Sequence, residues 1–341
     1  MLGTMSHASS QARVRARVSR MIPAGLWSRL LHADTFQDLS VQLRNSPGGE
    51  DLASDDPSVL ERNLRARQAV AARSLTTSLQ GRARELLAWY GRRFDIENLK
   101  AVVRAIHFDL DRERIWSMLL PLPEPTLPWR TLVETGSVPG LVDRLSATAY
   151  GRPLAPALER YQQESSPFFL EVALDLFYFR RLLRLIGVLR KKDRTQAERF
   201  LGRWIAVQNL LWAFRYRDHG GMSPEEIVNY TLHRAPGAGV DMVRRIALGS
   251  PLAAEAARFG FVLPDGAEGL DALHRLERLA AREMRRRAEA TLAGPIFHLG
   301  GVLAYLFLLE SEIADLTALI EGKLTGHPPD ELRGRLLREV S

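Results

Sequence analysis

The chain has 341 residues, 46% of them hydrophobic, and a formal net charge of +7 from 47 basic and 40 acidic residues. A chain of this length can bury a large core, and helical chains of this size divide into two or three domains, so one small compact domain is not expected. The absence of cysteine excludes disulfides, thiolate metal sites and a cysteine nucleophile, and the mixed charge is typical of solvated helix surfaces, without the dense basic footprint of a nucleic-acid-binding protein.

The first twenty residues are largely polar and contain four arginines, Arg13, Arg15, Arg17 and Arg20. They lack the order of charged, apolar and small residues that marks a secretory signal peptide. The sequence therefore does not indicate secretion, and we expect a cytoplasmic location.

Helical periodicity runs through almost the whole chain. From Glu171 to Arg190, for example, apolar residues recur at spacings of three and four, while most charged residues fall between them. Breaks occur at four prolines within residues 121–128, at a glycine pair before Ser223-Pro224, and at a glycine before Pro328-Pro329. We therefore predict an all-α chain of three helical units with approximate boundaries 1–120, 121–228 and 229–341.

An internal repeat supports this division. The segment Asp95-Ile96-Glu97-Asn98-Leu99 aligns with Ala206-Val207-Gln208-Asn209-Leu210 and with Glu312-Ile313-Ala314-Asp315-Leu316. The polar residues 98, 209 and 315 lie 111 and 106 residues apart, and apolar residues recur at −2, +1 and +5 from each of them. This spacing is one buried stripe of a helix, so each unit is expected to contain a core helix.

A second helix is expected after each core helix. Ile115, Ile227 and Leu332 follow the three polar residues by 17, 18 and 17 positions, each in a charged stretch. Before Ile227, the sequence Ser223-Pro224-Glu225-Glu226 predicts a helix start with proline in the first turn and a capping box.

The recurring polar residue has two interpretations. Asn98, Asn209 and Asp315 adjoin an apolar stripe, where an amide or carboxylate without a hydrogen-bond partner costs about 1–3 kcal/mol. We favour a structural role, in which the residue fixes a helix contact or loop in each unit. Binding of a ligand is the alternative.

No sequence motif predicts a cofactor, a metal or a catalytic group. A phosphate-binding glycine loop is missing, and Gly237-Ala238-Gly239 follows no strand. The ligand-type side chains of residues 107–111 (His107, Asp109 and Asp111) do not share one helix face and are flanked by arginines. Neither His219 nor His298 lies near a serine or acidic residue in an arrangement that suggests a nucleophile and base. Glu310 and Glu312 are expected to form salt links on a helix surface.

Three segments have features of a binding site or a membrane span, but each also has a simpler structural explanation. Residues 212–217 interleave aromatic side chains with arginines, as in single-strand binders, but Phe214 lies on the repeat's apolar stripe and favours core packing. Arg282, Arg285, Arg286 and Arg287 are expected to form a solvated helix face, with a binding patch as the alternative. The apolar run 292–309 approaches the length of a membrane span, but it contains Pro295, His298, Gly300 and Gly301, which favours a buried helix.

The segments now described resemble one family. Residues 90–105, containing Asp95-Ile96-Glu97-Asn98-Leu99-Lys100 followed by Arg104-Ala105, are similar to a characteristic segment of the C-type subunits of V/A-type rotary ATPases (ATP synthases), which are related to the d-type subunits of eukaryotic V-ATPases. Residues 305–324 resemble that family's closing segment, and residues 175–179 and 209–217 fit its middle part. The repeat positions that carry the resemblance are Asp95, Asn98, Leu99, Arg104, Asn209, Leu210, Arg215, Glu312, Asp315 and Leu316.

The resemblance implies a funnel-like molecule of three similar helical domains with pseudo-threefold symmetry. It implies a non-catalytic connector of the central rotor, one copy per complex, peripheral on the cytoplasmic face of the membrane. Its partners would be the D and F subunits of the rotor shaft and the membrane ring of proteolipid (c/K/L-type) subunits, and its work would link ATP hydrolysis or synthesis to transport of protons or sodium. No cofactor, nucleic acid or direct membrane span is implied.

The competing hypothesis is a free-standing helical-repeat scaffold that binds protein or nucleic-acid partners on a concave surface. Such arrays commonly have periods of about 30–50 residues. Three units of roughly 110 residues are longer than these periods, so they fit the scaffold hypothesis less well than they fit the rotor connector.

Overall fold

The computed structural model describes residues 2–49, 52, 54–264, 266–294 and 298–340, and within these ranges it contains helices and no strands. The prediction of an all-α fold is confirmed. The helices of the first third are α1 (Leu2–Val18), α2 (Ala24–Leu31), α3 (Phe36–Arg44), α4 (Pro57–Thr76), α5 (Gly81–Gly91), α6 (Arg93–His107) and α7 (Arg112–Met118). Those of the middle third are α8 (Trp129–Val133), α9 (Val138–Leu145), α10 (Gly151–Glu164), α11 (Phe168–Gly187), α12 (Lys191–Ala197), the π-helical turn η2 (Glu198–Gly202), α13 (Arg203–Asp218) and α14 (Pro224–Asn229). The last third contains α15 (Val240–Ala247), α16 (Leu252–Arg258), α17 (Gly269–Leu292), α18 (Leu299–Leu324) and α19 (Pro329–Arg335).

Local signals in the sequence account for many helix starts. Thr35 begins α3 and Ser223 begins α14 with a capping box, in which the hydroxyl accepts from the third helical N–H and the acidic side chain at that position accepts from the cap N–H. The predicted capping box at Ser223 is therefore confirmed. Asp56 caps α4 and Ser137 caps α9, and each is followed by proline in the first helical turn, where its missing N–H costs nothing.

Three core helices, α6, α13 and α18, carry the repeated sequence segments. Their stripe residues at −2, +1 and +5 are all buried, and the short helices α7, α14 and α19 follow them with Ile115, Ile227 and Leu332 turned inward and at most 3% exposed. At the last of these contacts a Cβ on Gly322 would collide with Leu332, so the absence of a side chain there lets α19 lie against α18.

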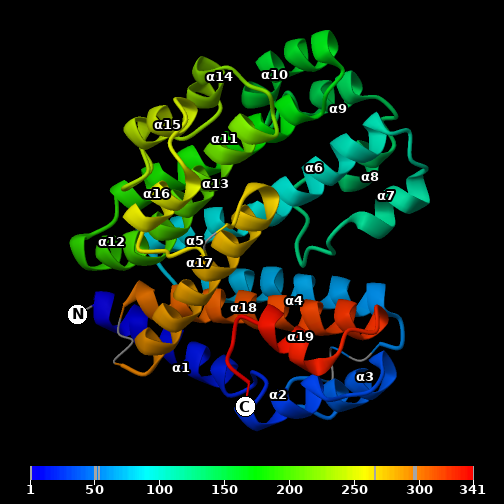
Figure 1. The fold of residues 1–341 in the computed structure, drawn as a ribbon, viewed down its shortest axis with the longest axis vertical. Coiled ribbons are helices and arrows are strands. Elements are labelled where there is room, and N and C mark those ends of the chain that lie inside the picture. Colours follow the sequence, from blue (N-terminus) through cyan, green and yellow to red (C-terminus); the bar gives the residue numbers. More distant parts are fainter. Residues whose placement is uncertain (1, 50–51, 53, 265, 295–297, 341) are drawn as a thin grey trace.

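Each core helix packs against the long helix of the segment that follows it. Helix α6 contacts α11, and α13 contacts α17. Helix α18 has no following segment and packs instead on α4 and α1, with α19 against α2. In Figure 1 the N-terminal and C-terminal helices accordingly share the lower part of the molecule, below the green helices α9–α14.

Polar contacts join the two ends of the chain. The Ile22 N–H donates to Glu312 Oε2 at 3.0 Å, and Lys323 Nζ donates to the Leu31 carbonyl at 2.7 Å. The Arg338 guanidinium lies over the buried Trp27 ring, 3.2 Å from its centroid. The first and last helices thus form one packed body.

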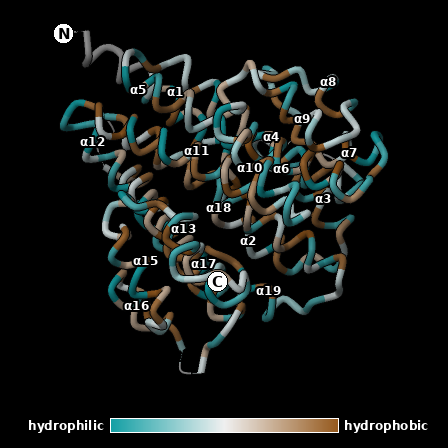
Figure 2. The backbone as a smooth tube through the Cα atoms, turned by 90° about the horizontal axis from the view of Figure 1, so that it is seen from above, coloured by the Kyte–Doolittle hydropathy of each residue, from teal (hydrophilic) through white to brown (hydrophobic). Residues whose placement is uncertain are grey.

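Hydrophobic and hydrophilic residues alternate along most of the backbone, as Figure 2 shows, which is typical of amphipathic helices around a shared core. No helix among the described residues has the length and apolar character to cross a bilayer. The apolar run 292–309 is not one buried helix, as its composition suggested, because α17 ends at Leu292 and α18 begins at Leu299. Residues 299–309 are buried inside α18, and residues 295–297 lie outside the described part of the chain.

Candidate functional site at the junction of the three core helices

One buried polar residue in each core helix holds a backbone segment that follows the next short helix. Asn98 Oδ1 accepts from the Leu120 N–H at 2.8 Å, and Asn98 Nδ2 donates to the Leu120 carbonyl at 3.0 Å. Asn209 Oδ1 accepts from the Leu232 N–H at 2.6 Å, while its Nδ2 donates to the carbonyls of Leu232 at 3.0 Å and Ala238 at 2.6 Å. Each amide therefore satisfies both backbone groups of one buried residue, as a neighbouring strand would.

The third core helix uses a carboxylate for the same task. Asp315 Oδ1 accepts from the Leu337 N–H at 2.6 Å, and Oδ2 accepts from Arg338 Nε at 2.8 Å. An ionised carboxylate cannot donate, so a guanidinium takes the place that a carbonyl has beside the two asparagines. The partners lie 22, 23 and 22 residues after the polar residues, and the Gly237-Ala238-Gly239 turn belongs to the segment held by Asn209.

The position three residues earlier holds the chain where it enters the next group of helices. Asp95 Oδ2 accepts from Thr126 Oγ1 at 2.7 Å, shortly before α8. Glu312 Oε2 accepts from the Ile22 N–H, shortly before α2. Ala206 occupies this position in α13 and cannot accept a hydrogen bond through its side chain.

The expectation of a surface salt link at Glu312 is wrong. Glu312 is 1% exposed, its Oε1 has no hydrogen-bond partner in the described chain, and burial raises its pKa although the Ile22 N–H stabilises the charged form. Because α18 is covered by α1, α4, α12 and α17, its faces are enclosed on nearly all sides, which periodicity within one helix does not reveal.

Ion pairs at equivalent positions join the first two core helices to their neighbours. Arg104, six residues after Asn98, binds Glu171 of α11 at 2.8 Å, and Arg215, six residues after Asn209, binds Glu277 of α17. The corresponding residue of α18 is the exposed Glu321. Partial burial of Glu61 on α4 raises the pKa of that carboxyl, and the charge of Glu321 raises it further. Leu99, Leu210 and Leu316, each directly after its polar residue, are completely buried.

The three core helices touch one another through one equivalent residue each. Arg93, Trp204 and Glu310 lie five residues before Asn98, Asn209 and Asp315. Arg93 Nη1 binds Glu310 Oε2 at 3.2 Å, and the Arg93 guanidinium lies 5.8 Å from the centroid of the Trp204 ring. We call these three residues the central junction.

Aromatic rings surround the Arg93 guanidinium of the central junction. The Arg93 guanidinium also lies 4.8 Å from the Tyr90 ring centroid and 4.9 Å from that of Phe94. Trp204 contacts the rings of Tyr90 at 6.2 Å and Phe307 at 6.3 Å between centroids. Trp204 and Glu310 also line a cavity of about 260 Å³ between α13, α17 and α18. A charge pair packed among rings resists displacement and is suited to transmitting force between helices.

The central junction is not apparent from the sequence alone. Each of its residues lies five positions before the repeated polar residue of its helix, but the side chains of arginine, tryptophan and glutamate are chemically unlike. The available signal was geometric: the three residues occupy one position of a repeat, and such positions converge if the copies are arranged around an axis.

Most of the arginine cluster in α17 serves contacts within the chain. Arg282 donates to the carbonyls of Gly334 and Leu336 at 3.0 and 2.8 Å. Arg285 pairs with Glu289 and Arg287 with Glu283. The expectation of a solvated face therefore holds for Arg286, which is exposed, but is wrong for Arg282, which ties α17 to the C-terminal segment.

The other candidate segments have structural roles. Trp212, Phe214 and Tyr216 are at most 9% exposed, so their rings belong to the core, as expected. Asp111 caps α7 through the Arg114 N–H, and His298 Nδ1 accepts from the Gly300 N–H at the start of α18. No group of three potential metal ligands occurs in the described residues.

Comparison with known proteins adds evidence independent of this geometry. The model of the family described as ATP synthase (C/AC39) subunit matches residues 10–335. The C subunit of the A-type ATP synthase of Methanocaldococcus jannaschii is 24% identical, over 97% of this chain and 86% of that protein. Its namesakes from Haloferax volcanii and Methanosarcina acetivorans are 27% identical over 96% of both chains, and 28% identical over 66% of this chain and 63% of that one.

Proposed function

Because the chain belongs to the family of ATP synthase (C/AC39) subunits, we propose that it is the non-catalytic connector of the central rotor in a membrane-bound rotary ATPase. It links the D and F subunits of the shaft to the proteolipid ring, so that ATP hydrolysis or synthesis is coupled to transport of protons or sodium. One copy sits peripherally on the cytoplasmic side of the membrane. Relatives along the full chain are named as the C subunits of A-type ATP synthases, which supports the assignment to such a complex.

The observation that carries this proposal is the central junction. A connector under torque must prevent its parts from sliding past one another, and direct contact of all three core helices at Arg93, Trp204 and Glu310 meets that need. The contact combines a charge pair with close-packed rings, and packed interiors transmit strain because they have low compressibility.

We also propose that the three units, with approximate boundaries 1–120, 121–228 and 229–341, are arranged with pseudo-threefold symmetry. Three sets of contacts support this symmetry. Core helices contact the long helix of the next group in the cycle α6 to α11, α13 to α17 and α18 to α4. The short helices contact the start of the next group in the cycle α7 to α8, α14 to α15 and α19 to α2. Equivalent residues meet in the central junction.

The shaft would bind beside this junction. Glu97, Gln208 and Ala314 lie one helical turn beyond Arg93, Trp204 and Glu310 on the same helix faces, and all three are half-buried or exposed. Three equivalent positions around one point suit the end of a shaft that approaches along the pseudo-threefold axis.

Site-specific labelling tests this contact. Because the chain has no cysteine, the single variants E97C, Q208C and A314C each carry one thiol, and S146C at the exposed C-cap of α9 is the control. In the assembled complex we expect Gln208→Cys to be protected from maleimide and Ser146→Cys to stay reactive. Equal labelling at all four positions would contradict the proposed shaft contact.

Reconstitution tests the rotor role itself. Vesicles with the complete complex should pump ions on addition of ATP, and complexes assembled without this chain should lose pumping while the peripheral sector still hydrolyses ATP. Purified chain alone should not hydrolyse ATP. Undiminished pumping without the chain would refute the connector role, whatever the labelling result.

A further inference from the structure

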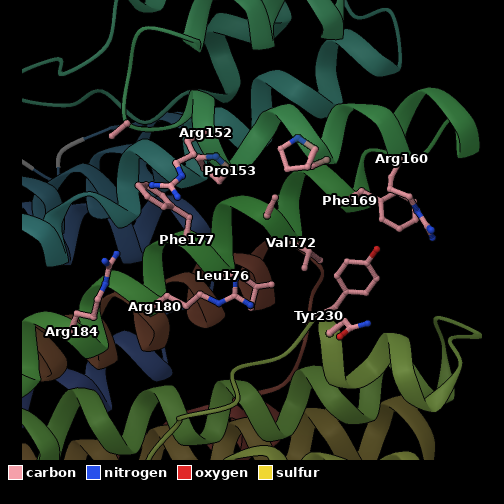
Figure 3. A pocket seen from close by; sticks show the side chains of 15 residues that line it. Arg152, Pro153, Arg160, Phe169, Val172, Leu176, Phe177, Arg180, Arg184 and Tyr230 are labelled. Atoms are coloured by element: carbon pink, nitrogen blue, oxygen red, sulfur yellow. The ribbon is translucent and has the colours of Figure 1, made fainter.

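A groove along one side of α11 has no role in the connections described so far. It is bounded by α10 on one side and by Asn229 and Tyr230, at the end of α14, on the other, and it encloses about 610 Å³. Figure 3 shows Val172 and Leu176 along its centre, Phe169 and Tyr230 at one end, and Arg180 and Arg184 at the other. We call it the α11 groove.

The floor of the α11 groove is apolar. Phe169, Val172, Leu176 and Phe177 follow one another at helical spacing on α11, and Pro153 and Pro156 face them from α10. An apolar stripe of this spacing on one helix matches a stripe of the same spacing on a second helix, as in peptides that bind by laying a helix into a groove.

The walls of the α11 groove carry only positive charge. Arg152, Arg160, Arg180 and Arg184 line it, and no carboxylate does. Arg160 pairs with Glu164 and Glu226 outside the lining, whereas Arg152, Arg180 and Arg184 have no ion-pair partner among the described residues. Desolvation lowers the pKa of Arg180, and no neighbouring carboxylate opposes the shift. Cations that line an apolar floor without carboxylates favour an anionic partner.

The groove continues past these arginines. Arg180 and Arg184 also line a second depression of about 810 Å³ with Leu183, Ile186, Arg234 and Pro236. Its single acidic residue, Glu198, is paired with Arg194. From Phe169 to Ile186 the floor helix rises about 26 Å at 1.5 Å per residue, the length of roughly five helical turns.

We propose that the α11 groove binds an acidic amphipathic helix of a protein partner, with the apolar face of that helix on the Val172–Leu176 floor and its carboxylates against Arg152, Arg180 and Arg184. The concave shape favours a rod-like occupant over a planar membrane, which would contact only the rims. This interaction is separate from the rotor role, and the two proposals are tested independently.

A designed peptide tests the inference. The probe is a fluorescein-labelled 18-residue peptide whose leucines lie at i, i+3, i+4 and i+7 and whose other positions are glutamate and alanine. Its binding to the full chain is measured by fluorescence anisotropy at low and at moderate salt. R180E/R184E is the test variant, and R130E/R144E is the matched control, because Arg130 and Arg144 are exposed elsewhere on the surface.

We expect the peptide to bind the parent chain and the R130E/R144E control alike, and to lose at least tenfold in affinity with R180E/R184E or with added salt. A peptide with lysine in place of glutamate should not bind. Circular dichroism and thermal melting identify any variant that fails to fold, and binding by Arg152→Glu provides a milder second test.

Two results would overturn the inference. One is an affinity of R180E/R184E for the acidic peptide equal to that of the parent chain, which would mean that the groove does not bind it. The other is binding to vesicles containing phosphatidylglycerol that R180E/R184E abolishes, with no peptide binding by the parent chain. That result would assign the arginines to a membrane surface.

Discussion

The amides of Asn98 and Asn209 stabilise the fold by satisfying backbone groups that have no other partner nearby. Replacement of Asn98 by leucine leaves the buried N–H and carbonyl of Leu120 unpaired, and the free energy of unfolding should fall by about 2–4 kcal/mol. Asn209→Leu should cost more, because three hydrogen bonds are lost in place of two. Urea unfolding followed by circular dichroism measures both.

Gln208→Leu is the matched control, since Gln208 adjoins Asn209 in the same helix but is only half-buried. It should change the free energy of unfolding by less than about 0.5 kcal/mol. Equal losses for Gln208→Leu and Asn209→Leu would mean that the amide contacts are not the source of stability.

Glu312 should make stability depend on pH in the direction opposite to that of a salt-bridged acid. Burial raises its pKa in the folded state, so the folded chain binds more protons than the unfolded chain between the ordinary glutamate pKa of about 4.5 and the raised value. The free energy of unfolding should therefore fall as pH rises through that window, and above it the loss is complete.

The variant Glu312→Gln isolates this effect, because its amide oxygen can still accept from the Ile22 N–H and it does not titrate. The difference in unfolding free energy between the variant and the parent should increase in the variant's favour as the pH rises from the ordinary glutamate pKa to the raised value, and should be constant above it. Any constant effect of the amide shifts the whole curve without changing its slope. A difference independent of pH would show that Glu312 titrates normally.

For single residues, the sequence shows which polar positions recur, but it does not show which groups their side chains bind. The repeated Asn98, Asn209 and Asp315 stand out by their spacing, but the backbone groups they bind lie in irregular segments with no pattern of their own. From the sequence, Glu312 is expected at the surface because a charged residue beside an apolar stripe is usually solvated. This expectation is wrong because four other helices pack around α18 and bury the residue.

Among the helices, the central junction should respond unequally to loss of its two charges. The Arg93 side chain is 9% exposed and the Glu310 side chain 40% exposed. Glu310→Met leaves a buried guanidinium without its carboxylate and should cost about 2–4 kcal/mol. Arg93→Met leaves a carboxylate that water can reach and should cost less than about 1.5 kcal/mol.

Thermal and urea unfolding of the two variants and of the double variant R93M/E310M test this order. The double variant should be more stable than Glu310→Met alone, because no unpaired charge remains. A larger loss for Arg93→Met would mean that its contacts with the rings of Tyr90 and Phe94 outweigh the ion pair.

Helix positions follow from the sequence where turn chemistry is clear. Ser223 begins α14 as predicted, whereas the apolar run 292–309 contains the end of α17 and the start of α18 in place of the single expected helix. Hydropathy averages over such a break, because apolar residues lie on both sides of it in the sequence. The packing of α18 on α4 has no local signal, since their sequences are separated by more than about 200 residues.

For the whole molecule, the two ends of the chain should hold together after the chain is cut. A protease site introduced in the proline-rich segment 121–128 divides the chain between α7 and α8. The two fragments should co-elute after cleavage, because α4 and α1 pack on α18 while α6 packs on α11. They should separate only in denaturant.

Size-exclusion chromatography before and after cleavage measures this, with an uncleavable linker of the same length as the control. Separation of the fragments without denaturant would contradict the closed packing. The all-α class was predictable from periodicity and the missing alternation of strands, but contact between the first and last helices depends on the whole chain being assembled.

The central junction has a consequence for how such a molecule can be made. Three identical subunits around a threefold axis would bring three copies of one side chain together, so Arg93, Trp204 and Glu310 could never meet in a homotrimer. In the pseudo-threefold arrangement proposed above, a charge pair at the axis is possible only because the three units are joined in one polypeptide and can differ in sequence. Covalent linkage thus allows an ion pair and an aromatic ring at one point, where exact symmetry would allow only three like charges or three like rings.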